Sequence, residues 1–87
     1  MTKGNVEIGD VVVSRAGRDQ GKYYAVIARE SEDFVLLADG DLRKLDRLKR
    51  KRVKHVKPVY RSISPEEMGS DAGIRKALSA VKPEKEG

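Results

Sequence analysis

The chain has 87 residues, of which 38% are charged and 38% hydrophobic, and its formal net charge is +5 at pH 7. This length allows one small domain with at most an appendage, and a chain of this size buries only about 60% of its unfolded surface, so its core is thin. No cysteine is present, which excludes disulfides and thiolate metal sites. No apolar run approaches the roughly 18 residues of a membrane span, and the N-terminus lacks a signal-peptide core, so we expect a soluble cytoplasmic protein with no membrane partner.

The first half of the chain predicts short strands separated by turns. Ile8–Arg15 contains a run of valines, and Tyr23–Arg29 and Phe34–Ala38 are similarly rich in β-branched and aromatic residues. Each segment is bounded by glycine and acidic residues, which is typical of strands. Met1–Asn5 is expected to be frayed.

The segment Arg18–Lys22 predicts a turn between the first two strands. Asp19 is expected to accept a hydrogen bond from a backbone amide two residues on, and Gly21 to adopt a positive φ. Exposed amides in such a turn, flanked by two cations, would form a donor site for a phosphate. We therefore favour RNA contact for Arg18 and Lys22, and a purely conformational role for Asp19 and Gly21.

Two further strands are expected in the middle of the chain. Asp39-Gly40 is a strong hairpin signal, and Leu42–Leu48 is predicted as the fourth strand, although its apolar spacing also fits a helix. Val53–Val59 alternates and predicts a fifth strand, which Pro58 confines to an edge of the sheet. Several short strands separated by turns predict an all-β fold, a small barrel over residues 6–60.

The last third of the chain predicts helix. Ser64–Glu67 has the signature of a helix start that Gly69 ends, and Ser70 is the expected cap of a second helix. An apolar stripe with helical spacing follows, made of Ile74, Ala77, Leu78 and Val81. We expect residues 61–82 to form an extension with a short helix, and residues 83–87 to form a disordered tail.

The positive charge of the chain is concentrated in Arg43–Lys57, which holds nine of the 19 Lys and Arg residues and one acid. The rest of the chain then has 19 − 9 = 10 basic and 14 − 1 = 13 acidic residues. Crowded like charges repel, and a partner with closely spaced phosphates offsets that repulsion by releasing counterions. The alternative is a lysine-rich edge strand that blocks aggregation. We favour RNA binding through exposed side chains of this run, namely Arg43, Lys44, Arg47, Lys49, Arg50, Lys51, Arg52, Lys54 and Lys57.

The segment from Val11 to Leu37 resembles a KOW motif, with Gly21 at its eleventh position. The segment Phe34–Gly40 followed by the basic run that ends at Lys54-His55 is similar to KOW proteins of the archaeal and eukaryotic large ribosomal subunit, and to short bacterial KOW-domain RNA-binding proteins. The resemblance covers roughly Ile8–Val59. It implies an SH3-like barrel with a short C-terminal α-helix, and binding to ribosomal RNA or the ribosome.

Two single residues are further candidates for RNA contact. Tyr23 and Tyr24 are adjacent, so on a strand they face opposite sides; we expect Tyr23 to be the exposed ring that stacks on a splayed base, with packing at the rim of the core as the alternative. His55, the one histidine, is expected to contact RNA among the cations or to pack on the barrel rim.

The sequence offers no catalytic constellation. P-loops, Rossmann turns and paired catalytic carboxylates are absent, and the acidic cluster of Glu30, Glu32 and Asp33 is interpreted as a solvated loop rather than a Mg²⁺ site. We expect a non-catalytic RNA-binding module that is a monomer when free and uses no cofactor or metal. Its partners would be ribosomal RNA and, in addition, ribosomal proteins. The alternative function is a protein-interaction module of the transcription or translation machinery, with the helix Ile74–Val81 and the less basic face of the barrel as its contact surface.

Overall fold

The computed structural model describes residues 6–81. The expected frayed start, Met1–Asn5, and the expected disordered tail both lie outside the described residues. Within residues 6–81, no helix is long and apolar enough to span a membrane.

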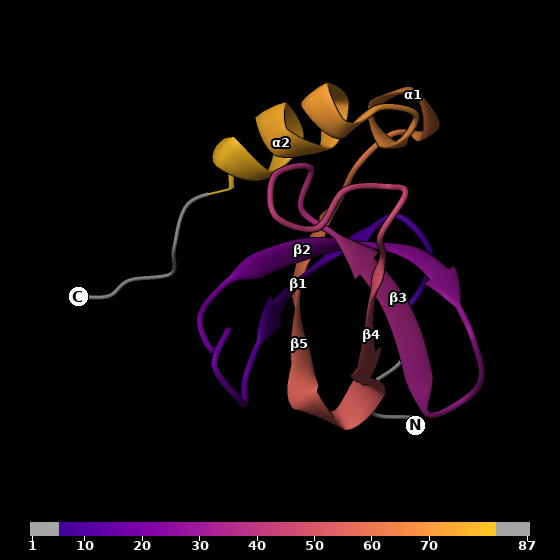
Figure 1. The fold of residues 1–87 in the computed structure, drawn as a ribbon, viewed down its shortest axis with the longest axis vertical. Helices are drawn as coiled ribbons and strands as arrows, with labels where there is room; N and C mark the ends of the chain where they lie inside the picture. The colour runs from indigo at the N-terminus through magenta and orange to yellow at the C-terminus, as the bar shows by residue number, and fades with distance from the viewer. Residues whose placement is uncertain (1–5, 82–87) are drawn as a thin grey trace.

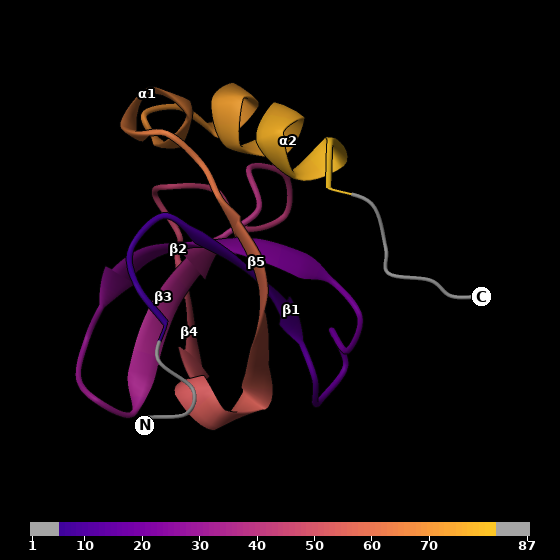
Figure 2. The same cartoon turned by 180° about the vertical axis from the view of Figure 1, so that it is seen from behind.

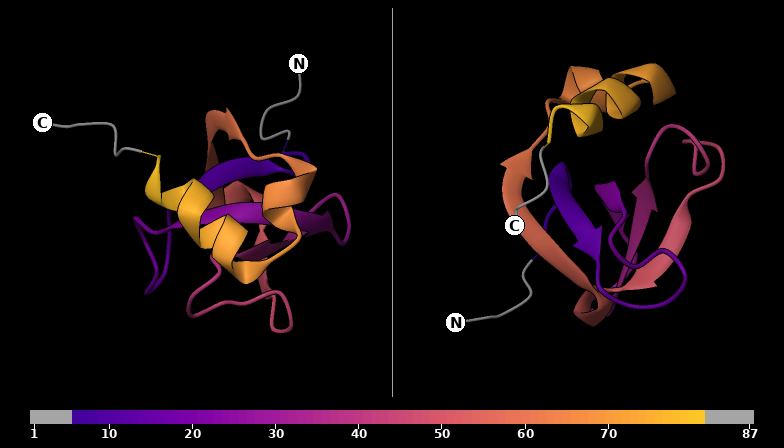
Figure 3. Two further views of the ribbon diagram at one scale, coloured as in Figure 1. Left: turned by 90° about the horizontal axis from the view of Figure 1, so that it is seen from above. Right: turned by 90° about the vertical axis from the view of Figure 1, so that its left-hand side faces the viewer.

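The chain forms one antiparallel sheet that curls on itself. The sheet has five strands in the order β4-β3-β2-β1-β5, and the short 3₁₀ helix η1 (Val53–His55) joins the two edge strands. Figure 1 shows this turn at the end of the barrel opposite the helices, and Figure 3 shows the curvature of the sheet. The predicted all-β, barrel-like fold is confirmed. The strands are β1 (Asp10–Ser14), β2 (Tyr23–Arg29), β3 (Phe34–Ala38), β4 (Lys49–Arg52) and β5 (Val56–Ser62).

Both faces of the central strands are buried. Alternation along β1 sends Val12 into an inner core inside the curled sheet and Val11 into an outer core on its convex face. The inner core contains Val6, Val12, Tyr24, Val26, Val35, Leu37 and Val56. The outer core is built on Val11, Ala25, Ala38, Ile63 and Ile74.

Two helices cover the outer core: α1 (Pro65–Met68) and α2 (Asp71–Ser79). Figure 2 shows both on the same side of the sheet, reached from the end of β5. Ile74 is fully buried, and the rest of its predicted stripe packs beside it. The helices are therefore part of the domain's packing, because without them the outer face of β1 and β2 would be exposed apolar surface.

The helix ends match their sequence signals. Ser64 and Glu67 form a reciprocal capping box at the start of α1, and the helix ends at Gly69. The Ser70 hydroxyl accepts a hydrogen bond from the Gly73 amide at 3.0 Å, which confirms Ser70 as the cap of α2.

The predicted fourth strand, Leu42–Leu48, is wrong. Residues 39–48 form a loop in which the Asp39 carboxylate accepts hydrogen bonds from the amides of Asp41 and Arg43, both at 2.8 Å. The Leu45 amide donates to the Asp71 carboxylate at the start of α2, at 2.7 Å. Because these amides are used by side chains, they are not available to a strand ladder. Leu45 and Leu48 pack instead into the outer core.

The strand β4 begins later, within the basic run, and the predicted fifth strand is shifted. Val53–His55 forms η1, so β5 starts at Val56 and continues to Ser62. Pro58 does lie on an edge strand, since β5 pairs with β1 alone in the sheet order, and Pro58 is opposite Val12.

Two glycines with positive φ provide a test of how α2 is docked. Gly40 has a φ of 77° and Gly21 a φ of 92°. A Cβ at Gly40 would clash with the Asp71 carbonyl oxygen and the Arg75 amide, whereas a Cβ at Gly21 would have no neighbour within 4 Å.

We expect Gly21→Ala to lower the free energy of unfolding by about 1 kcal/mol through backbone strain alone. Gly40→Ala should lower it by roughly 2–4 kcal/mol, because the helix must also move. Urea unfolding of the two variants measures the difference, and equal losses would contradict the close docking of α2 on this loop.

Candidate nucleic-acid interface

The lysines of β4 point toward the inner side of the sheet. Lys51 is paired with Val35 and Lys49 with Leu37, and both partners belong to the inner core. Directly paired residues share a face of the sheet, so the two lysines lie at the inner edge of the barrel. Their side chains are 11% and 25% exposed. The expectation that Lys49–Arg52 is uniformly exposed is therefore wrong for these two residues.

The carboxylate of Asp19 forms ion pairs with both lysines. Lys51 Nζ lies 2.9 Å from Asp19 Oδ1 and also donates to the Ala16 carbonyl at 2.9 Å, while Lys49 Nζ is 3.6 Å from Asp19 Oδ2. The Ser14 hydroxyl donates to Oδ1 at 2.9 Å and the Tyr24 hydroxyl to Oδ2 at 3.0 Å. Asp19 thus connects the β1–β2 loop with β1, β2 and β4.

These contacts shift the pKa of the Asp19 carboxyl group and that of the Tyr24 hydroxyl group in opposite directions. Burial by itself would raise the pKa of Asp19, but hydrogen bonds from Lys51, Ser14 and Tyr24, with the charge of Lys51, hold it well below its usual range. Burial, together with the hydrogen bond to Asp19, raises the pKa of the Tyr24 hydroxyl above its ordinary value. Asp19 is therefore ionised and Tyr24 neutral at physiological pH.

The turn itself differs from its expected form. Gly21 has the predicted positive φ, but the Asp19 side chain reaches across to other strands instead of to an amide of its own turn. The amides of Gln20, Gly21 and Lys22 donate to carbonyl groups within the loop and β1. The predicted amide cradle for a phosphate is therefore wrong at these positions, because the donors are already used.

The arginines of β4 lie on the opposite, outer face. The Arg50 guanidinium carbon is 3.7 Å and that of Arg52 4.9 Å from the centroid of the Phe34 ring, which is cation–π geometry. Arg50 also pairs with Glu30. The positive charge of Arg50 is thus partly neutralised by the Glu30 carboxylate.

The segments that meet at the end of the barrel where η1 lies carry five exposed cations. The Arg15 amide donates to the His55 carbonyl at 2.8 Å, and Lys51 joins β4 to Ala16, so the β1–β2 loop is held against η1 and β4. We call this region the basal surface. The residues on this surface that the sequence predicted to contact RNA and that are exposed in the structure are Arg18, Lys22, Arg52, Lys54 and Lys57.

The remaining predicted cations lie elsewhere. Lys44 and Arg47 are exposed and Arg43 is half-buried, all in the 39–48 loop beneath α2 (Figure 1). That loop holds three basic and three acidic residues, so it has no net charge. The single basic run of the sequence is therefore divided between two ends of the molecule.

Tyr23 and His55 are both half-buried. Tyr23 packs against the outer core, which favours the packing alternative over a free stacking ring.

Three exposed side chains were not predicted from the sequence: Arg15 and Arg61, which lie outside the basic run, and Tyr60, which is 90% exposed. No local pattern distinguishes them in the sequence, because their exposure follows from how β5 and the β1–β2 loop pack.

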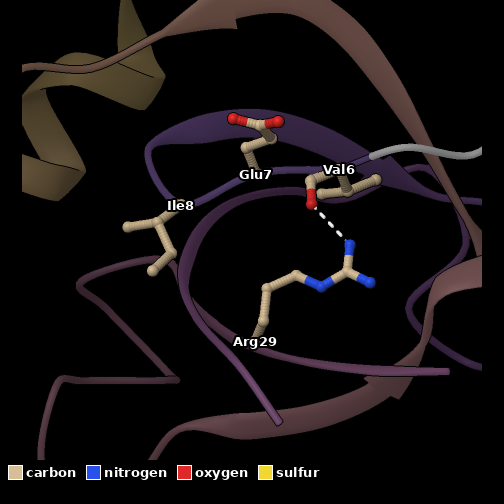
Figure 4. A pocket seen from close by; sticks show the side chains of 4 residues that line it. All are labelled: Val6, Glu7, Ile8 and Arg29. Carbon is tan, nitrogen blue, oxygen red and sulfur yellow. Dashed lines mark hydrogen bonds between the residues drawn. The ribbon is translucent and has the colours of Figure 1, made fainter. Parts of the chain in front are cut away.

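A hollow on the surface is lined by Val6, Glu7, Ile8 and Arg29 (Figure 4). The Arg29 guanidinium is already hydrogen-bonded within the protein, since it donates to the Val6 carbonyl at 2.6 Å and to that of Glu32 at 3.3 Å.

In residues 6–81, no cluster of three or more His, Cys, Asp or Glu side chains is placed to hold a metal ion.

The chain is similar in sequence to two large ribosomal subunit proteins. It is 32% identical over 76 residues to "Large ribosomal subunit protein eL14" of Staphylothermus marinus, a match that covers 85% of this chain and 77% of the relative. It is 28% identical over 76 residues to the protein of the same name from Pyrobaculum calidifontis, with 87% and 74% covered. No protein-family model matches the chain. The similarity confirms, at the level of the family, the expected relationship to KOW-like ribosomal proteins.

The Asp19 cluster predicts a specific dependence of stability on pH. Asp19→Asn should lower the free energy of unfolding by about 2 kcal/mol at pH 7, because Lys51 and Tyr24 lose an ionised acceptor in a poorly solvated site. Folding lowers the pKa of Asp19, so its contribution is complete above the unfolded pKa of about 3.9 and is lost as the pH falls below that value.

The stability difference between Asp19→Asn and the parent should therefore shrink in acid, as measured by urea unfolding across the pH range. Asp46→Asn is the control, since Asp46 is exposed and its replacement should change stability little. A difference that stays constant down to about pH 2 would show that Asp19 is not the stabilising anion of this cluster.

Proposed function

This chain belongs to the family of the large ribosomal subunit protein eL14, and we propose that it is a non-catalytic protein that binds ribosomal RNA through its basal surface. The observation that supports this location is the distribution of charge in the folded chain. Residues 49–63 contain seven basic residues and no acid, and residues 15–22 add three basic residues and Asp19. These two segments meet at the basal surface, where the Val53 amide also donates to the Asp33 carbonyl and so brings in the acidic β2–β3 turn. The cations of the two segments outnumber Asp19 and the three acids of that turn, Glu30, Glu32 and Asp33, whereas the 39–48 loop is neutral.

The physical basis of binding is electrostatic. RNA phosphates exchange condensed counterions for protein cations, which gives affinity without a need for base contacts. Arg18 and Arg52 have planar guanidinium groups that can bridge two phosphate oxygens, while the lysines act as point charges. Lys51 contributes only a long-range field, because its ammonium group is hydrogen-bonded to Asp19 and Ala16. Lys49 forms a looser ion pair with Asp19 at 3.6 Å, which weakens its attraction for a phosphate.

The alternative role, a protein-docking module that uses the C-terminal helix, has less support. The apolar stripe of α2 that would contact a partner is packed on the outer core, with Ile74 fully buried. The proposed role places the protein in the cytoplasm on the ribosome, where contacts with ribosomal proteins would add to those with RNA.

A pair of matched triple variants tests the proposal. Arg18→Gln, Lys54→Gln and Lys57→Gln together remove three exposed charges from the basal surface, and Lys44→Gln, Arg47→Gln and Lys76→Gln remove three exposed charges outside it. Affinity for a hairpin RNA is measured by fluorescence anisotropy at several salt concentrations. The basal variant should bind more weakly, with a slope of log K against log[salt] shallower by roughly 2–3, because three phosphate contacts are lost.

The control variant has the same net charge as the basal variant, so it shows the effect of overall charge alone. It should keep a slope close to that of the parent. If the two variants weaken RNA binding equally, the basal surface is not the interface. If neither the parent nor the variants bind RNA in a salt-dependent manner, the RNA-binding function itself is contradicted.

A further inference from the structure

Tyr60 on β5 combines an unfavourable backbone conformation with near-complete exposure. Its φ is +57°, and it is the one non-glycine residue with a positive φ among residues 6–81. The left-handed region is disfavoured for bulky side chains, because Cβ crowds the following carbonyl oxygen. The side chain is 90% exposed, so packing of the ring within the domain does not explain this conformation.

Tyr60 lies where the pairing of β1 with β5 shifts its register. Asp10 is opposite Ser62 and Val12 is opposite Pro58, with a shift of register between them. Val11 of β1 therefore faces a longer stretch of β5, which contains Tyr60. In a regular strand, Tyr60 would share the face of Val56 and Pro58 and point to the inner side of the barrel. Instead, Tyr60 lies within the shifted stretch, where it has no paired residue on β1, and its side chain is exposed to solvent. Bulges are over-represented next to functional sites, where they re-aim a side chain.

The Tyr60 side chain takes part in neither core and in none of the hydrogen bonds of residues 6–81. By contrast, Val59 just before it and Ile63 three residues after it pack into the outer core. Glycine or asparagine adopts the left-handed conformation more easily than tyrosine. A strained conformation that presents an aromatic ring to solvent is the kind of outlier that points to a binding role.

The surroundings of Tyr60 indicate which kind of partner would use the ring. Lys57 and Arg61 are exposed on the same strand, and no acidic residue occurs between Lys49 and Ser64. Asp10, opposite Ser62 on β1, already accepts a hydrogen bond from the Glu7 amide. Aromatic rings next to cations are the arrangement that binds unpaired nucleotides, because the ring stacks on the base and the cations hold the phosphates.

We propose that Tyr60 stacks on an unpaired base of the bound RNA, with Arg61 and Lys57 on the adjacent phosphates. This inference rests on the proposed RNA-binding function and adds to it a contact with a base. It extends the basal surface along the free edge of β5, since Lys57 belongs to both. It also predicts that the protein prefers RNA with unpaired nucleotides to fully paired RNA of the same length.

The test uses Tyr60→Asn, which removes the ring but tolerates the left-handed conformation, and Tyr60→Phe, which keeps the ring. The two probes are a hairpin RNA with an unpaired loop and a fully paired duplex of the same length. Tyr60→Asn should bind the hairpin at least about fivefold more weakly than the parent, since one stacked base contributes at least that factor. It should bind the duplex like the parent, and Tyr60→Phe should bind both probes like the parent.

The salt dependence separates stacking from charge. Because the substitution removes no cation, the slope of log K against log[salt] should be unchanged in Tyr60→Asn. The thermal melting temperature should not fall, because asparagine relieves the backbone strain. Trp is absent from the chain, so Tyr60→Trp supplies a single fluorophore whose emission should be quenched on binding the hairpin.

Two negative outcomes have different meanings. If the parent binds the hairpin in a salt-dependent manner but Tyr60→Asn binds it equally well, the stacking proposal is overturned while the RNA-binding function stands, and Tyr60 is then a candidate for protein contact. If the parent binds neither RNA, the RNA-binding function is contradicted, and the stacking proposal falls with it.

Discussion

The ion pair between Asp19 and Lys51 is the interaction on which the arrangement of this small barrel depends. Strand β4 consists of four consecutive cations, Lys-Arg-Lys-Arg, so it has no apolar side chain to bury. It is held by its backbone pairing with β3 and by the Asp19 carboxylate, which also binds the ends of β1 and β2 through Ser14 and Tyr24. The aliphatic stem of Lys51 can cover the edge of the inner core while its ammonium group reaches the carboxylate.

This ion pair reconciles two interpretations of the basic run that the sequence left open. Inward-pointing charges on an edge strand prevent edge-to-edge aggregation, and Lys49 and Lys51 have that geometry. The alternate residues face outward, where Arg52 lies over Phe34 and is exposed. One strand therefore serves both purposes, because successive residues of a strand point to opposite faces.

The same interaction builds the basal surface. Lys51 holds the β1–β2 loop against β4 through Asp19 and Ala16, and this brings Arg18 and Lys22 to the cations that follow β4. In the sequence these residues are separated by more than one strand. Their approach is a consequence of sheet closure, and no local pattern in the chain predicts it.

The features predicted correctly depend on local chemistry. The valine run, the Ser64 and Ser70 caps and the stripe on α2 are each determined within a few residues, because strand alternation, capping and helical spacing act over that range. Leu42–Leu48 was ambiguous between strand and helix, and it forms neither, since the carboxylates of Asp39 and Asp71 use its amides. The role of Asp19 and the exposure of Tyr60 depend on contacts between distant segments, which the sequence alone does not specify.

Lysine reactivity measured with and without RNA tests the central claim, that the basic run is divided into structural and RNA-binding cations. The protein is labelled briefly with an amine-reactive ester and each site is quantified by mass spectrometry. In the free protein, Lys51 should react slowest, because its ammonium group is bound to Asp19 and Ala16. Bound RNA should then protect the basal lysines and leave the others unchanged. The protected set is Lys22, Lys54 and Lys57, and the unchanged set is Lys44 and Lys76. Rapid labelling of Lys51 in the free protein, or protection of Lys44 and Lys76 in place of the basal lysines, would contradict the account.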